Sequence, residues 1–114
     1  MRDFIRVMKA LSEPNRIKII KILQHKHMCV CELQHALGIS QPTVSKHLKL
    51  LKEAQLVFFT KDGLWVDYHL NGGSYNPYAA CLLGNLRHWL KDDNKITELT
   101  DKLPSIHRKA IRKK

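Results

Sequence analysis

The stretch Ser40-Gln41-Pro42-Thr43-Val44-Ser45-Lys46-His47-Leu48-Lys49 decides the fold. Its first residue is a good N-cap and predicts a helix from Gln41 to about Ala54. Val44, Leu48 and Leu51 fall on one face of that helix, while the opposite face is polar and mostly basic. The apolar face is therefore expected to pack on a core and the basic face to stay outside.

A shorter helix and a glycine turn precede this stretch. Glu32 to Leu37 are predicted to be helical, and Gly38 suits the left-handed conformation that ends a helix. A short helix, a turn containing glycine and a second helix form a helix-turn-helix, whose second helix enters the major groove of DNA. We therefore predict that this part of the chain reads double-stranded DNA.

Seven residues are predicted to contact DNA. Gln41 is expected to read adenine and Lys46 guanine, since their side chains match the edges of those bases in the major groove. Hydroxyl groups contact base edges or phosphates, and lysines farther out hold flanking phosphates, which fix register without carrying sequence information. His47 is included although it lies at the edge of the buried face. The predicted contacts are Gln41, Thr43, Ser45, Lys46, His47, Lys49 and Lys61.

A β-hairpin is predicted directly after the reading helix. Residues 56–60 are β-branched and aromatic, and residues 64–70 alternate between apolar and more polar side chains. Lys61-Asp62-Gly63 between them reads as a tight turn. In a winged helix such a hairpin is the wing, and it brings Lys61 to the tip.

Three further helices complete the expected fold. Two precede the reading unit, near residues 4–11 and 14–24, and the second is apolar enough to be the central core helix. One long helix follows the hairpin from Tyr78 to Leu103, with a kink near Asp92 to Asn94. The expected fold is mainly α with a β-hairpin wing, a winged helix-turn-helix in the order α-α-α-α-β-β-α.

The length of 114 residues suits one domain. We predict one DNA-binding and dimerisation domain over residues 1–104, because Pro104 ends the last apolar helix. Residues 105–114 contain five Lys or Arg and little apolar content, so a mobile basic C-terminal tail is expected there.

The charge of the chain also favours a nucleic-acid partner. Twenty Lys and Arg against ten Asp and Glu give a formal net charge of +10, which favours binding to a polyanion through phosphate neutralisation. No apolar run approaches the roughly 20 residues that a membrane-spanning helix needs, and the first residues lack the apolar core of a signal peptide. We expect a cytoplasmic protein without a membrane partner. In that reducing compartment, three cysteines do not predict a disulfide framework.

Three short segments carry a family resemblance. They are Leu11-Ser12-Glu13-Pro14-Asn15-Arg16, Cys29-Val30-Cys31-Glu32-Leu33 and the stretch from Ser40 to Leu48. On these segments the chain resembles the ArsR/SmtB family of bacterial and archaeal repressors, over about residues 4–90. The resemblance implies a homodimer built on the first and last helices. It also implies two recognition helices that read an inverted-repeat operator, with loss of DNA affinity when a toxic metal or metalloid binds. No cofactor is expected for DNA binding itself.

Gln55 departs from the pattern of that family, which usually has glycine after the recognition helix. A residue other than glycine in a left-handed C-cap costs on the order of 1 kcal/mol. We therefore expect the end of this helix to be built differently here.

The cysteines Cys29 and Cys31 are the predicted ligands of the inducing ion. Their side chains would diverge by about 200° in a regular helix and point the same way in extended chain, so chelation favours an unwound first turn. Because that turn belongs to the reading unit, ion binding and DNA binding would be coupled. Thiolates select soft ions, which favours arsenite or antimonite, while cadmium, lead and zinc remain open.

A third sulfur ligand is missing from the expected position. Trivalent arsenic is expected to take three sulfurs, and family members with this motif often have a third cysteine at the position of Gln34. Cys81 is the only other cysteine. It is either a third ligand, within a protomer or across the dimer, or a small buried hydrophobe. Nitrogen ligands to zinc from three nearby histidines are also open, although such histidines are more often exposed: His25, His27 and His35.

Two other functions remain open. The same winged helix could sense oxidation, with the neighbouring thiols forming a disulfide or a mixed disulfide. A dithiol enzyme, such as an arsenate reductase or a redox carrier, is the remote alternative. No anion-binding loop, nucleotide motif or catalytic triad accompanies the thiols. We therefore predict a repressor and not an enzyme.

Overall fold

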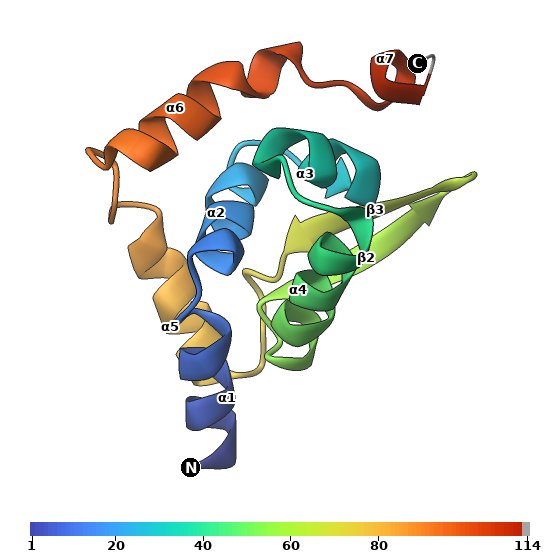
Figure 1. Cartoon of the computed structure of the whole chain (residues 1–114). Coiled ribbons are helices and arrows are strands. Elements are labelled where there is room, and N and C mark those ends of the chain that lie inside the picture. The colour runs from blue at the N-terminus through green and yellow to red at the C-terminus, as the bar shows by residue number, and fades with distance from the viewer. Residues whose placement is uncertain (113–114) are drawn as a thin grey trace.

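The computed structural model describes residues 1–112 and shows a body of helices with a small sheet, whose hairpin projects to one side (Figure 1). It confirms the predicted fold class, mainly helical with a hairpin wing. None of the helices in this part of the chain is long and apolar enough to cross a membrane. The elements in chain order are α1 (Arg2–Ala10), α2 (Pro14–Leu23), β1 (Met28–Cys29), α3 (Val30–Leu37), α4 (Gln41–Glu53), β2 (Val57–Asp62), β3 (Trp65–Leu70), α5 (Pro77–Leu86), α6 (Asn94–Lys102), the 3-10 turn η1 (Leu103–Ser105) and α7 (Arg108–Arg112).

Helix α2 is the centre of the core, as its composition predicted. Ile19, Ile20 and Ile22 lie on different sides of this helix, and all three are fully buried. The Glu13 carboxylate caps its N-terminus by accepting a hydrogen bond from the Arg16 backbone N–H. The other elements are therefore placed around a fixed central helix.

The helix-turn-helix is built as predicted. Gly38 ends α3 in the left-handed conformation with φ of 69°, and the Ser40 hydroxyl accepts a hydrogen bond from the Thr43 N–H at the start of α4. Val44 and Leu48 are buried on the inner face of α4. The outer face of α4 is therefore free to meet a ligand.

The end of α4 corrects one expectation. Gln55 adopts a left-handed conformation with φ of 62°, so the helix ends in the way that glycine normally allows. The Gln55 N–H donates to the Lys52 carbonyl at 2.9 Å, and the Leu56 N–H donates to the Leu51 carbonyl at 3.0 Å. These two bonds form a Schellman motif. The expectation of a differently built helix end was therefore wrong, and Gln55 takes the strained conformation instead.

The sheet contains a strand that the sequence pattern did not predict. It has the order β1-β3-β2, and all of its strands are antiparallel. Strand β1 is only two residues long, with Met28 opposite Tyr68 and Cys29 opposite Asp67. Two residues are too few to show alternation. This pairing places one of the two neighbouring cysteines directly beside a strand of the wing.

The predicted long C-terminal helix is interrupted. Helix α5 ends at Leu86, Leu90 has a left-handed φ of 65°, and Asp93 caps the new helix α6. The buried Lys21 ammonium donates hydrogen bonds to the carbonyl oxygens of Leu86, at 2.8 Å, and Trp89, at 3.0 Å. These bonds satisfy carbonyls that a continuing helix would have paired. The break therefore spans residues 87–93 and is wider than the kink expected at 92–94.

The segment expected to be a mobile tail is docked as far as the structure describes it. Ile106 is buried, and Arg108 of α7 forms ion pairs with Asp67 and Glu32. Figure 1 shows the chain after α6 crossing to the side of α3, where α7 contacts that helix. The low apolar content of the segment is offset by the buried Ile106 and by the ion pairs of Arg108 with two buried carboxylates. The last two residues of the predicted tail, Lys113 and Lys114, lie outside the described residues.

Candidate DNA-binding face and dithiol site

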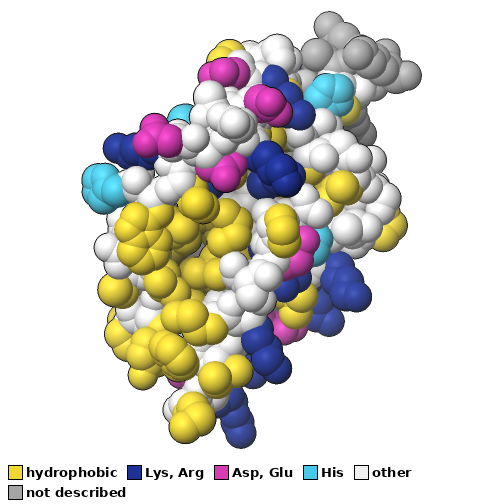
Figure 2. Space-filling model, turned by 60° about the vertical axis from the view of Figure 1, so that its left-hand side comes forward, with side chains coloured by type: hydrophobic (Ala, Val, Ile, Leu, Met, Phe, Trp, Pro, Cys, Tyr) yellow, Lys and Arg dark blue, Asp and Glu magenta, His cyan; other side chains and the backbone are white. Residues whose placement is uncertain are grey.

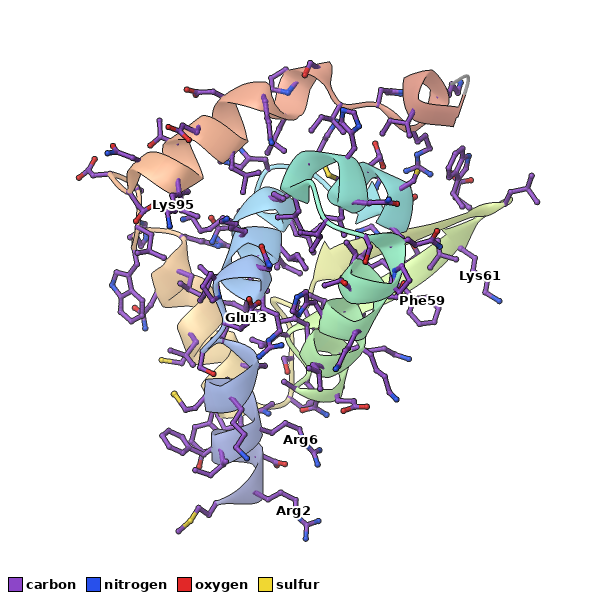
Figure 3. The ribbon with its side chains drawn as sticks, viewed as in Figure 1. Arg2, Arg6, Glu13, Phe59, Lys61 and Lys95 are labelled. Atoms are coloured by element: carbon purple, nitrogen blue, oxygen red, sulfur yellow. The ribbon has the colours of Figure 1, made fainter. Side chains whose placement is uncertain are left out.

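Six of the seven predicted DNA contacts lie exposed on α4 and the wing. Figure 3 shows Lys61, together with Phe59, projecting from the hairpin away from the helical body. The Lys52 ammonium lies 4.7 Å from the centre of the Phe59 ring, a contact that ties the end of α4 to the wing and that the sequence analysis missed. The exposed residues are Gln41, Thr43, Ser45, Lys46, Lys49 and Lys61.

His47 lies apart from this exposed row. It is half-buried, and its Nδ1 accepts a hydrogen bond of 3.2 Å from Arg16, while its Nε2 lies 3.7 Å from a Glu13 carboxylate oxygen. Arg16 also donates to the Ala10 carbonyl at 2.6 Å. Burial lowers the pKa of His47 below its usual value, against the opposing effect of Glu13. The structure thus places His47 at the junction of α1, α2 and α4.

The two neighbouring cysteines meet at the start of α3. Cys29 is the N-cap, with extended φ and ψ of −85° and 172°, and Cys31 lies in the first turn. Their Sγ atoms are 3.0 Å apart. The helix begins between the two cysteines and not at Glu32 as expected, so the sulfurs meet without an unwound turn. The geometry favours a dithiol site that is already assembled.

The dithiol lies at the edge of the core. Cys29 is 4% exposed and Cys31 is half-buried, so the pair can be reached from the side of Cys31. Glu32 accepts a hydrogen bond of 3.1 Å from the Cys29 N–H. Burial, the hydrogen bond with Cys31 and the nearby Glu32 charge raise the pKa of the Cys29 thiol to about 12. An ion that binds here must displace the Cys29 proton.

Cys81 is exposed on α5, so the interpretation of it as a buried hydrophobe was wrong. Its sulfur accepts a hydrogen bond of 3.5 Å from the Asn85 side chain. In residues 1–112, no three or more His, Cys, Asp or Glu side chains are grouped so that they could hold a metal. Within one protomer, Cys81 is therefore not grouped with Cys29 and Cys31. The nearby histidines are exposed, as expected: His25, His27 and His35.

An apolar surface covers α1 and α5, the helices on which the dimer was predicted. Figure 2 shows hydrophobic side chains gathered on this face. Phe4 and Tyr78 make an edge-to-face contact between the two helices, with ring centres 5.3 Å apart, yet both side chains remain about two-fifths exposed. Ile5 and Met8 are exposed to a similar extent. Exposed apolar side chains grouped in this way are typical of a protein interface.

The fold and the basic reading helix define the class of winged-helix DNA-binding proteins. Residues 13–57 match the family described as bacterial regulatory protein, arsR family. The arsenic resistance transcriptional regulator ArsR1 of Pseudomonas putida is 41% identical over 91 residues, which are 76% of this chain and 71% of that protein. The arsenical resistance operon repressor of Escherichia coli is 41% identical over 68 residues, 59% of this chain and 58% of that protein. The chain belongs to the ArsR family, as its motifs predicted.

Solved structures agree with this assignment. The homodimeric winged helix-turn-helix DNA-binding domain of a possible ArsR-family regulator from Mycobacterium bovis has a TM-score of 0.65 and 27% identity. That match covers 75% of this chain and 76% of that one. The transcriptional repressor BigR from Xylella fastidiosa has a TM-score of 0.58 and 31% identity, over 71% of this chain and 79% of that one. The winged helix is therefore the DNA-binding module of a transcriptional regulator.

Proposed function

We propose that this protein is a homodimeric cytoplasmic repressor that leaves its operator when arsenite, antimonite or another soft ion binds Cys29 and Cys31. The observation that carries the proposal is the 3.0 Å separation of the two sulfurs at the start of α3. That helix is the first of the helix-turn-helix, so the ion would bind within the reading unit itself. The names of the two arsenic-resistance relatives support the same inducer.

The dithiol suits a soft ion in its chemistry. Two sulfur donors at one position are the ligands that arsenite, antimonite, cadmium and lead prefer. The exposed side of Cys31 offers a way in, and the burial of Cys29 keeps water from one side of the bound ion. Cys81, exposed on α5, stays our candidate for a third ligand supplied across the dimer.

DNA release follows from the position of the site. Cys29 pairs with Asp67 of β3, and Cys31 belongs to α3, which packs against α4. A bound ion imposes its own coordination geometry on the two sulfurs. It therefore acts on β3 of the wing and on α3, which supports the reading helix α4. Binding of the ion and binding of DNA weaken each other reciprocally.

A DNA-binding assay tests this proposal. Operator fragments are first selected from a random DNA pool with the reduced, ion-free protein. We expect low micromolar arsenite to weaken operator affinity about tenfold or more, within the usual range of allosteric coupling. The Cys29→Ser, Cys31→Ser protein should bind the same DNA and stay bound with arsenite. An unchanged operator affinity of the wild type in arsenite contradicts the metalloid function.

The same sulfur separation favours a second candidate, a sensor of oxidation. Two thiols 3.0 Å apart can be oxidised to a disulfide while peroxide is reduced to water. Release of DNA by peroxide, in the absence of any ion and reversed by a dithiol reductant, would favour this function. The comparisons with regulators lend no support to the remote alternative, a dithiol enzyme.

A further inference from the structure

The C-terminal segment folds back over the dithiol site. Ile106 is 2% exposed, and the Lys26 ammonium donates a hydrogen bond of 3.0 Å to its carbonyl oxygen. Beyond it, α7 lies against α3, and Ile111 and Cys31 line the same cavity of about 350 Å³. Ile111 therefore forms part of the wall of the cavity at Cys31.

Arg108 is the residue of this segment that reaches the buried side of the site. Its guanidinium donates a hydrogen bond to Asp67 and lies 3.6 Å from a Glu32 carboxylate oxygen. Glu32 in turn accepts the hydrogen bond from the Cys29 N–H. Arg108 is thus separated from the cysteine pair by a single side chain.

Arg108 also contacts the wing. Asp67, its ion-pair partner, belongs to β3 and is the residue opposite Cys29 in the sheet. The Arg108 guanidinium lies 4.7 Å from the centre of the Trp65 ring, at the start of the same strand. One side chain therefore joins the dithiol site to the strand that continues into the wing.

Among residues 1–112, one N–H group of Arg108 has no hydrogen-bond acceptor. The buried carboxylates of Asp67 and Glu32 both pair with this guanidinium, yet its Nη1 is buried without a hydrogen-bond partner among residues 1–112. Burial alone would lower the pKa of Arg108, but the hydrogen bond to Asp67 and the charges of Asp67, Glu32 and Cys29 raise it. A soft ion binds cysteine as thiolate. The bound sulfurs can accept hydrogen bonds, and a cation with an unused N–H beside Glu32 can donate one to them.

We propose that Arg108 is a positioning residue of the ion site, which donates its unused N–H to an ion-bound thiolate and carries ion binding to the wing through Asp67 and Trp65. This inference rests on the proposed function, because it assumes that Cys29 and Cys31 bind a soft ion.

Tryptophan fluorescence and ion-binding calorimetry test the proposal together. The chain has two tryptophans, so a Trp89→Phe protein reports on Trp65 alone. In that protein we expect arsenite or Cd²⁺ to change the Trp65 emission. Arg108→Gln should weaken the affinity for both ions about tenfold or more and remove the emission change. Arg108→Lys should restore part of the affinity, because it keeps a charged N–H donor without the planar fork. Lys109→Gln, a loss of the same charge at an exposed neighbour, should change neither measurement.

A double variant separates the proposed role from simple pairing with Asp67. Asp67→Asn, Arg108→Gln removes one of the two carboxylates that lose their partner in Arg108→Gln. It therefore guards against poor folding of the single variant, and circular dichroism checks the fold. We expect ion affinity to stay weak in the double variant, and full recovery overturns the proposal. Equal affinity and an equal emission change in the Arg108→Gln and parent proteins also overturn it, while the proposed function stands. A parent protein that binds neither ion refutes the proposed function, and the inference with it.

Discussion

The reading face and the dithiol corner differ in almost every physical property. The reading face consists of the predicted DNA contacts on α4 and the wing. All of these side chains except His47 are exposed: Gln41, Thr43, Ser45, Lys46, Lys49 and Lys61. The dithiol corner, formed by Cys29, Cys31, Glu32, Asp67 and Arg108, consists mostly of buried side chains that bond to one another. Side chains of the first region are mostly exposed to solvent, whereas side chains of the second form hydrogen bonds and ion pairs with one another. Substitutions should therefore change DNA binding in the first region and stability or ion response in the second.

Asp67→Ala should have the largest effect on stability. It leaves the half-buried Arg108 with only the more distant Glu32 as a partner, and breaking such a pair costs about 3 kcal/mol. Urea unfolding should show this loss. Asp62→Ala, an exposed carboxylate on the same hairpin, is the matched control and should stay within about 0.5 kcal/mol of the wild type. A similar loss of unfolding free energy in the two variants would contradict the larger contribution of the dithiol corner to stability.

Gln41→Ala should relax sequence specificity by about 1–3 kcal/mol at one base pair, the usual value of a good base contact. Its unfolding curve should match that of the wild type, because the side chain is exposed. Affinities for operators substituted one base pair at a time measure the effect. A uniform loss across all operators would show that Gln41 contacts the backbone of DNA and not a base.

Lys61→Ala should weaken binding to every DNA sequence alike and lower the slope of log affinity against log salt by about one unit. Lys95→Ala, on α6 and away from the wing (Figure 3), removes the same charge and serves as the control. A change in sequence preference without a change in the salt slope would contradict a phosphate contact at Lys61.

Gln55→Gly should stabilise the protein by about 1 kcal/mol, because glycine adopts a left-handed conformation without strain. Thermal unfolding measures this effect. Glu53→Gly, two residues earlier in regular helix, should instead destabilise by about 1 kcal/mol. A Gln55→Gly protein that is less stable than the wild type would show that the Gln55 side chain compensates for its backbone.

His47 should give the smallest effect, visible in the pH dependence of stability. Its pKa is lowered in the folded protein, mainly by burial, so the unfolded chain takes up its proton first as pH falls. Its contribution is complete above the unfolded pKa of about 6.5 and declines as pH falls below that value. His47→Gln should remove this part of the pH dependence, measured by urea unfolding between pH 8 and about 5. An equal change in exposed His25→Gln would contradict the assignment.

The sequence predicted which side chains of α4 are exposed, because exposure on a helix follows its periodicity. The positions of Val44 and Leu48 on the inner face of α4 determine which neighbours point outward. The dithiol corner was predicted only as a pair of cysteines. Asp67 and Arg108 join it through a two-residue strand and a C-terminal segment that reaches back 41 residues. No local sequence pattern predicts such contacts, because they depend on tertiary packing.

The buried Lys21 ammonium fixes the position of α5 on the core. It ties the end of α5 to the central helix α2, so α5 cannot slide without stranding a buried charge. If α1 and α5 form the dimer interface, the distance between the two reading helices is then as rigid as the core. Such a dimer selects operators by spacing as well as by sequence. One base pair inserted between half-sites turns one of them about 35° around the DNA axis, out of reach of its helix.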